Sequence, residues 1–340
     1  MEQLVGVLNY IVFFGISAGI YAVLALGLNL HWGMTGLFNI GVAGFYAVGA
    51  YASALVCGLP PSAWDARIVG GFDLPFVVGL LAAVVASGVL ALLLGIPTLR
   101  LRADYLGIAT IGIAETVRLM LKNEAWLTNG VWGLQQIPSP LYEAIHRLTS
   151  GYLRAHPDLR PWQQALVSRA YNGFYLLLVI VIVVILYRVL RRLSRSPWGR
   201  ALRAIREDEV AAAMTGKNVF AFKLQALVVG AMVMGIAGAL YAHSARFISP
   251  ASFEPLYGTF LVWVMLMVGG SGNHKGAILG AVVVWGIWAA TDFLTGYLPF
   301  TATQVAALRV LAIALLLETA ILWRPKGILP ESRGKRPSHS

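Results

Sequence analysis

Stretches of about twenty mostly apolar residues recur along this chain, and they constrain its fold more than any other feature. A helix that crosses the hydrocarbon core of a bilayer needs about 20 such residues. Nine stretches reach or approach that length, at roughly 9–30, 36–57, 75–97, 104–121, 173–190, 224–242, 256–270, 277–298 and 304–323. We therefore predict an all-α polytopic membrane protein with about nine transmembrane helices. The count could run from eight to ten, because the second stretch is rich in glycine and the seventh is short.

Composition agrees with this fold and excludes several classes of function. Of 340 residues, 58% are hydrophobic and 12% are charged, whereas an average soluble domain carries about 25% charged residues. The single cysteine rules out an intrachain disulfide and a cysteine-rich metal site. The six histidines show no metal-ligand spacing, so we expect no metal site. The N-terminus lacks the basic start and the cleavage site of a signal peptide, and the first apolar stretch is expected to be retained.

The net charge of +11 is explained by basic loops. Lysine and arginine mark the cytoplasmic loops of membrane proteins, and here they gather in 98–103, 188–223 and 324–340. Nine spans place all three segments on one side. The C-terminus and its tail are then cytoplasmic and the N-terminus is outside. The segment 122–172 is then periplasmic, and the expected partner of the basic loops is membrane lipid rather than nucleic acid.

Small residues at four-residue spacing predict close helix packing. Gly15 and Gly19 form one such pair, and Gly272, Gly276 and Gly280 form a longer series. Residues of this kind let two helix backbones approach each other inside a membrane. We interpret both as packing features without a chemical role.

The segment SPWGRALRAIREDEVAAAMTGKN, residues 196–218, is predicted to form one helix in the cytoplasmic loop. Ser196 suits the N-cap, and Pro197 suits the first helical position, where its missing N–H costs nothing. Gly216 suits the C-terminal end. Between these ends lie residues of good helix propensity, with Leu202 as part of an incomplete apolar stripe.

Charged residues in this helix are spaced to form pairs along its surface, Arg203 with Glu207 and Arg206 with Glu209. Two interpretations follow from the pattern. The helix is either a solvated connector between two spans or a docking surface for a soluble partner. A partner would be needed for ATP-driven work, because the chain has no GxxxxGK[ST] phosphate-binding loop.

Polar residues concentrate between the first two spans, in NLHWGMTGLFNIG at 29–41. This segment is either a tight cytoplasmic turn or a broken helix, and backbone that leaves the helix at membrane depth must be buried in protein or line a wet cavity. Its candidate pathway residues are Asn29, Trp32, Thr35, Asn39 and Gly41. We add Glu115, a charge inside a span, although a mutual pair with Arg118 is the favoured interpretation. Asp292 and Arg309 are expected to pair, and Glu318 has no assigned role.

Four blocks carry a resemblance to one family. They are LGLNLHWGMTGLFNIGVAGFYAVGAYASAL at 26–55, LRLRADYLGIATIGIAE at 99–115, SPWGRALRAIREDEVAA at 196–212 and GGSGNHKGAILGA at 269–281. Together they resemble LivM-type permeases of branched-chain amino-acid importers. The loop also resembles the EAA pattern of ABC-importer permeases, with Val210 in place of the glutamate, Ala211 and Ala212 following, and Gly216 at the matching distance.

The resemblance implies a function for the whole chain. Residues 1–340 would be one transmembrane permease domain of an ATP-driven importer in a bacterial inner membrane. Its partners would be a LivH-type permease, two cytoplasmic ATP-binding subunits that carry ATP and Mg, and a periplasmic substrate-binding protein. The 188–223 loop would couple to the ATPases. The coupling residues would be Arg200, Arg203, Ile205, Glu207, Asp208, Glu209, Ala212 and Gly216.

The sequence also allows other functions. A urea or short-amide importer permease would have a similar sequence. A secondary transporter driven by an ion gradient often has a repeated half and needs coupling-ion sites, and the chain has no clear repeat. HExxH, GxSxG and paired-carboxylate patterns are absent, so we expect neither catalytic residues nor a cofactor in this chain.

Overall fold

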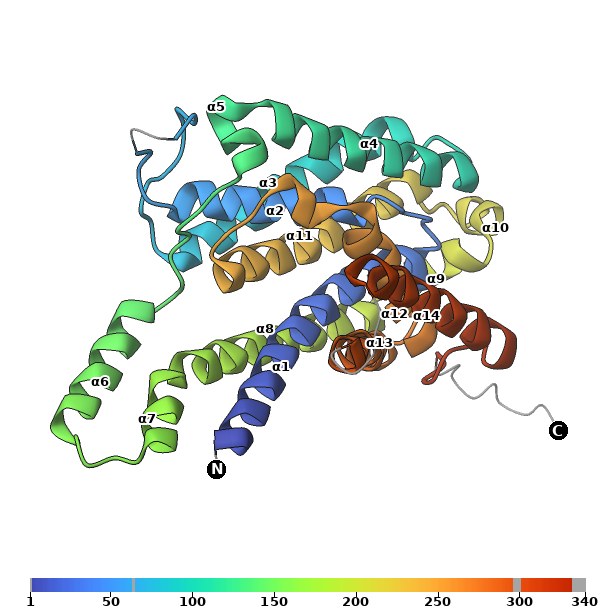
Figure 1. Ribbon diagram of the computed structural model, residues 1–340. Helices are drawn as coiled ribbons and strands as arrows, with labels where there is room; N and C mark the ends of the chain where they lie inside the picture. The colour runs from blue at the N-terminus through green and yellow to red at the C-terminus, as the bar shows by residue number, and fades with distance from the viewer. Residues whose placement is uncertain (1, 63–64, 296–300, 332–340) are drawn as a thin grey trace.

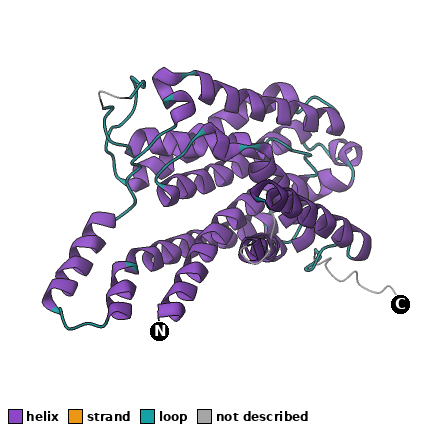
Figure 2. Ribbon diagram, in the orientation of Figure 1, coloured by secondary structure: helices purple, strands orange, loops and turns teal. Residues whose placement is uncertain are grey.

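The computed structural model describes residues 2–62, 65–295 and 301–331. Over these residues the regular structure is helical, and one antiparallel bridge, between Leu134 and Ile248, is the nearest approach to a strand. Figure 2 shows the same composition of helices and connecting loops. The predicted all-α polytopic fold is confirmed.

A helix coincides with each predicted span. These helices are α1 (Glu2–Leu28), α2 (Val42–Cys57), α3 (Phe76–Thr98), α4 (Ala103–Asn123), α8 (Ala170–Arg195), α11 (Val219–Ala245), α12 (Leu261–Gly269), α13 (His274–Thr295) and α14 (Ala302–Trp323). Among the described residues, five helices are long and apolar enough to cross a membrane: α1 with its extension to Met34, α3, α8, α11 and α13. α2 and the helix Leu256–Gly269 are apolar but shorter.

The boundaries of two predicted spans differ from the structure. The second span was expected over 36–57, but residues 36–41 are not helical and α2 starts at Val42. The seventh begins as a π-helix, η4 (Leu256–Phe260), before α12. The predicted end of the eighth span, 296–298, and the side chain of Asp292 lie outside the described residues.

The centre of the bundle is α11, which packs against α1, α2 and α3 (Figure 1). The contact with α2 is backbone to backbone: a Cβ on Gly49 would overlap the main chain of Gly235, and one on Gly238 would overlap the carbonyl oxygen of Tyr46. Neighbouring alanines such as Ala50 and Ala237 are fully buried. Small residues thus allow α2 and α11 to approach closely, as they do in other membrane proteins.

The other side of α1 packs against α8 through the first predicted glycine pair. A Cβ on Gly15 would overlap the side chain of Leu176, and one on Gly19 would overlap Val179. These two aliphatic side chains of α8 fill the space that the glycines leave open. The predicted packing role of Gly15 and Gly19 is confirmed.

The second glycine series divides into two parts. Gly276 and Gly280 in α13 lie against Gly269 of α12, and a Cβ on Gly280 would overlap the carbonyl oxygen of Met265. Gly272 instead precedes α13 and has φ +81°, in the left-handed region that favours glycine. The packing prediction is therefore confirmed for Gly276 and Gly280, whereas Gly272 is a turn residue.

α3 presents an apolar face to the surroundings. Val77, Leu81, Val85, Val89 and Leu93 follow one another at four-residue spacing, and each is at least half exposed. Side chains at this spacing lie on one side of a helix. A continuous apolar stripe of this length suits the hydrocarbon of a bilayer rather than water.

Opposite ends of the bundle carry different segments (Figure 1). One end holds α5 (Ala125–Thr128), η2 (Gly130–Trp132), α6 (Tyr142–Ala155) and α7 (Pro161–Ser168). The other holds α9 (Pro197–Glu207) and α10 (Glu209–Met214). The α3–α4 link and the tail reach this second end too, since Arg100 and Arg206 line one pocket and Arg206 pairs with Glu331. The two basic loops and the described part of the tail, 324–331, therefore share one end, here called the basic end.

Candidate functional site

The connection between α1 and α2 is a buried break in helical structure. α1 continues as a π-helix, η1 (Asn29–Met34), and the chain is then non-helical from Gly36 to Gly41. Gly36 has φ +74°, which a residue with a Cβ rarely adopts. We call residues 29–41 the α1–α2 break. Asn29, Thr35 and Asn39 are buried in it, so the segment is not a solvent-facing turn.

One chain of hydrogen bonds anchors the start of the break. The amide N–H of Gly272 donates to Asn29 Oδ1 (2.8 Å), and Asn29 Nδ2 donates to His274 Nδ1 (2.9 Å). His274 Nε2 then donates to Ser194 Oγ (2.6 Å), whose hydroxyl donates to the carbonyl of Leu190 (2.7 Å). Every donor in the chain has an acceptor only if His274 is neutral and carries its proton on Nε2. This chain of hydrogen bonds connects the α1–α2 break to α13 and α8.

A second histidine holds the end of the break in the same way. His31 Nε2 donates to the carbonyl of Leu227 in α11 (2.9 Å), and its Nδ1 accepts from Asn39 Nδ2 (3.0 Å). Asn39 Oδ1 accepts the amide N–H of Gly41 (2.8 Å). Asn29 and Asn39 thus accept from the amides of Gly272 and Gly41, which lie outside helices, so these main-chain donors are not left unpaired.

Aromatic rings and α4 close the outside of the break. Trp32, Phe38 and Trp263 lie with their ring centroids 5.3–5.6 Å apart, and Trp263 Nε1 donates to the carbonyl of Asn39 (3.0 Å). The amide N–H of Ile40 donates to Thr110 Oγ1 in α4 (3.0 Å). The break therefore contacts α4, α9, α11, α12 and α13, and it reaches α8 through His274.

Arg206 of α9 connects the basic end to the break. Its guanidinium donates to the carbonyl oxygen of Gly33 in η1, to Glu331 Oε2 (2.8 Å) and to Glu207 Oε1 (2.8 Å). Burial of the group opposes its charged form, but these carboxylates hold the pKa of Arg206 above its ordinary value. One side chain thereby joins α9, the break and the C-terminal segment.

Arg203 makes a second, indirect connection. Its guanidinium donates to the carbonyl oxygen of Ser194 (3.1 Å), the residue whose hydroxyl accepts from His274. Leu202 and Ile205 of the same helix are buried. α9 is thus packed onto the bundle rather than solvated on all sides, which a free connector would be.

The predicted single helix over 196–216 is wrong in its middle. Ser196 caps α9 as expected, and Gly216, with φ +76°, follows the end of α10. Between them Asp208 is extended, and its side chain accepts from the amides of Val210 and Ala211. An aspartate that caps a new helix competes with continuation of the old one, so α9 and α10 are separate.

The division between α9 and α10 also changes one of the expected ion pairs. Arg206 and Glu209 were expected to pair, but Glu209 accepts from Lys223 Nζ (2.5 Å), and Arg206 pairs with Glu331 and Glu207. The extended Asp208 removes the helical register that would have placed positions three apart on one face.

Seven of the eight predicted coupling residues are either exposed or buried, and Arg203 is half-buried. The exposed members are Arg200, Glu207, Asp208, Glu209 and Gly216. Ile205 and Ala212 are buried, so they position the helices and are not free to meet a partner. The most exposed apolar side chains of the segment are Val210 (66%) and Met214 (83%), four residues apart on α10.

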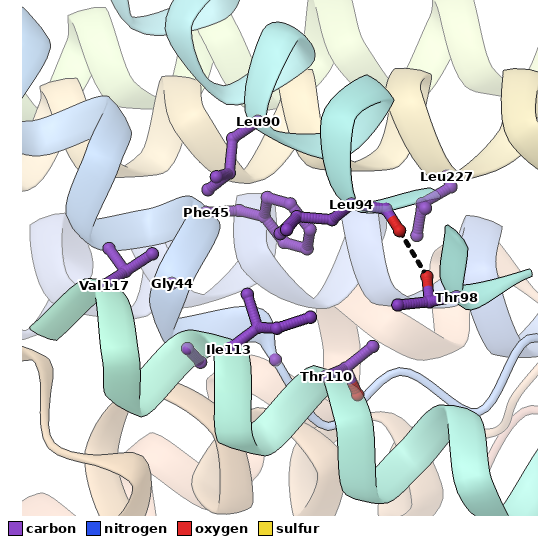
Figure 3. Close-up of a pocket in the computed structure, with 11 residues that line it drawn as sticks. Gly44, Phe45, Leu90, Leu94, Thr98, Thr110, Ile113, Val117 and Leu227 are labelled. Atoms are coloured by element: carbon purple, nitrogen blue, oxygen red, sulfur yellow. Dashed lines mark hydrogen bonds between the residues drawn. The ribbon is translucent and has the colours of Figure 1, made fainter. Parts of the chain in front are cut away.

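Glu115 pairs with Arg118 as favoured, through two bonds of 2.9 and 2.5 Å. Their helix, α4, faces α2, α3 and α11 across an apolar crevice (Figure 3). Leu90 and Ile113 reach into it from opposite walls, and Thr110 is one of two hydroxyl residues that line it. Gly41 at the end of the break also lines this crevice.

Sequence reasoning missed His31, His274, Ser194 and Arg206 as members of the site. Both histidines lie in blocks that are rich in glycine and asparagine, 26–55 and 269–281. Their position in these blocks is the one feature of the sequence that could have marked them as members of the site. Arg206 was assigned to a local pair, because its partners Gly33 and Glu331 are distant in sequence.

Comparison with known proteins identifies the family. Residues 10–320 match the family described as "Branched-chain amino acid transport system / permease component". The chain belongs to this family of permeases. It is 34% identical over 318 residues to the high-affinity branched-chain amino acid transport system permease protein LivM of Escherichia coli (strain K12), covering 92% of this chain and 68% of that protein.

Two further relatives have lower sequence identity. The permease is 25% identical to the probable LivM of Methanocaldococcus jannaschii, covering 92% of this chain and 91% of that protein. It is also 23% identical to LivH of Escherichia coli (strain K12), covering 92% and 95%. No solved structure gives a significant match. The resemblance to LivM-type permeases is confirmed, and the chain is a multi-pass transport subunit.

Proposed function

We propose that this permease forms half of the translocation pathway of an ATP-driven importer of leucine, isoleucine and valine. Membership of the family and 34% identity to a LivM protein support the substrate class. Similarity to LivH supports a second, related permease as the other half. Two cytoplasmic ATPases with ATP and Mg, and a periplasmic binding protein, complete the importer in the inner membrane.

The basic end is the proposed cytoplasmic side. Its three segments are rich in arginine and lysine, which stay inside during membrane insertion. Segment 122–172 then faces the periplasm together with the N-terminus, and none of the residues of its helices α6 and α7 is buried. In this orientation α9 and α10 face the compartment that holds ATP.

The observation that carries the mechanism is the bonding of Arg206. An ATPase docks on the exposed apolar pair Val210 and Met214 with the acidic residues beside it, and its closure pushes α9. Arg206 passes this displacement to the carbonyl of Gly33 and so to the α1–α2 break. The break then moves the helices that it contacts, and the pathway alternates between outward and inward access. The energy comes from the partner, and this chain contributes the gate.

The candidate pathway residues serve this gate mainly through the backbone. The amide groups of Asn29 and Asn39 are bonded within the chain, and Thr35 donates to the carbonyl of Leu30. They set the shape of the break, and they do not present free polar groups to a substrate. The crevice beside Gly41 is lined mainly by apolar side chains, but its volume of about 10 Å³ is too small for an aliphatic amino-acid side chain in this conformation.

Transport in a defined system tests the proposal. The permease is reconstituted with its second permease, both ATPases and the binding protein in proteoliposomes, and uptake of labelled leucine is measured. We expect uptake that requires ATP and the binding protein and that persists with a protonophore. Uptake of urea in preference to leucine would identify the alternative substrate class. Uptake without ATPase that collapses with the protonophore would contradict an ATP-driven importer.

Orientation has a separate test, because the chain has one cysteine, Cys57, which is buried. In a Cys57→Ser background, Met214→Cys and Trp132→Cys place thiols at opposite ends. A membrane-impermeant maleimide applied to intact cells is expected to label position 132 and not 214. The reverse labelling pattern would invert the proposed topology.

A further inference from the structure

A second pocket lies at the basic end, between the α3–α4 link and α9. Its volume is about 390 Å³. Four basic side chains and one carboxylate line it: Arg100, Arg102, Arg206, Lys223 and Glu209. Leucines of the link and the start of the non-helical part of the break complete its walls. The pocket is thus strongly basic, partly apolar and adjacent to the α1–α2 break.

The charges in this pocket are not equally compensated. Glu209 accepts from Lys223, and Arg206 is occupied by Glu331 and Glu207. Arg100 and Arg102 are exposed, and no carboxylate of the described residues lies within ion-pair distance of either. Two arginines two residues apart in a short link can therefore turn their guanidinium groups towards one anion. Arginine matches the oxygens of a phosphate particularly well.

The mouth of the pocket continues into apolar surface. Leu101 stands between the two arginines and is 45% exposed, and on α4 Tyr105 and Ile108 follow, exposed to 62% and 67%. On the other side of the link, Ile96 belongs to the exposed face of α3. A ligand with its anionic part in the pocket would therefore have its apolar part against α3 and α4, within the hydrocarbon.

We propose that this pocket binds the headgroup of an anionic glycerophospholipid. The phosphate lies between Arg100 and Arg102, and the acyl chains follow the exposed side of α3 and α4. Basic pockets between helices on the cytoplasmic side of a membrane are suited to such headgroups. The lipid would bridge the α3–α4 link to α9, close to Arg206. This site does not depend on which substrate the permease carries.

Native mass spectrometry of the assembled importer in detergent tests the site. Phosphatidylglycerol and phosphatidylcholine with identical acyl chains are titrated, and the apparent Kd of the tightest adduct is measured. We expect phosphatidylglycerol to bind more tightly to the wild type. Arg100→Gln with Arg102→Gln should weaken it about 30-fold, because each basic residue near an anionic lipid contributes about one factor of five. Arg191→Gln with Arg192→Gln, exposed on α8 and outside the pocket, should change it less than twofold.

Three results would overturn the assignment. They are equal phosphatidylglycerol affinity in the Arg100/Arg102 double variant and the wild type, equal affinity of the wild type for the two lipids, and displacement of the lipid by inorganic phosphate at constant ionic strength. The last would show that the site takes a soluble phosphate. If the glutamine variant does not assemble, Arg100→Lys with Arg102→Lys keeps both charges, and retained preference for phosphatidylglycerol is then expected.

Discussion

Replacement of Arg206 by glutamine should separate ATPase docking from transport. The side chain is 22% exposed and holds the carbonyl of Gly33 and the carboxylate of Glu331. A hydrogen bond to a charged group contributes about 1.5–3 kcal/mol, and an exposed ion pair contributes less than about 1 kcal/mol. After allowance for solvent, the contact between α9 and the break should lose about 2 kcal/mol, or roughly 30-fold in its population.

The assay compares three quantities in reconstituted importer: attached ATPase, ATP hydrolysis stimulated by the binding protein, and leucine uptake. In Arg206→Gln we expect the ATPases to remain attached, because Val210 and Met214 are untouched, while stimulation and uptake each fall at least tenfold. Arg192→Gln is the matched control, an exposed arginine of α8. Uptake within twofold of the wild type, or loss of the ATPases from the complex, would refute transmission through Arg206.

Three further variants test the remaining contacts. His274→Ala leaves the buried amide of Asn29 without its acceptor, at a cost of about 2 kcal/mol, and the thermal midpoint in detergent should fall by several degrees; an unchanged midpoint would argue against the bonded chain. Gly280→Val should prevent α12 from packing against α13, which would alter the size-exclusion profile; a normal profile would contradict the close packing. Gly286→Ala is the control, because its Cβ meets only the ring of Phe14 at 3.7 Å and the variant should behave as wild type. Asp208→Ala removes the N-cap of α10, which contributes about 1 kcal/mol, so the amount of ATPase that co-purifies should fall about fivefold. Asp208→Asn should keep the cap and the wild-type amount of ATPase. If the alanine variant also recovers the wild-type amount, the cap has no role in docking.

The helices of this permease were predictable because their apolar runs are long and the solvent of a membrane protein is lipid. The limits of the prediction lie where a local pattern permits two structures. Residues 196–216 read as one helix because every residue tolerates one, and only the capping bond of Asp208 selects two. Residues 36–41 are apolar enough for a span, yet their main-chain groups bond to side chains: Thr110 and Trp263 from distant helices, and Asn39 from within the segment.

The candidate site was recoverable only in part for the same reason. Asn29 and Asn39 could be singled out, because amides in an apolar segment need partners. Their partners His274 and His31 could not be paired with them, since the bonds depend on the tertiary arrangement. Arg206 was mistaken for half of a local pair, and its contact with Glu331 spans 125 residues.

The bonded chain through Asn29, His274 and Ser194 has a consequence for the energy stored across the membrane. Buried histidines with hydroxyl neighbours are the usual parts of a proton relay. The chain of hydrogen bonds in this permease starts at the peptide N–H of Gly272, which does not release a proton, and ends at the carbonyl of Leu190, which does not take one up. It has no entry and no exit. This chain of hydrogen bonds therefore gives protons no path across the membrane, although it contains an ionisable ring.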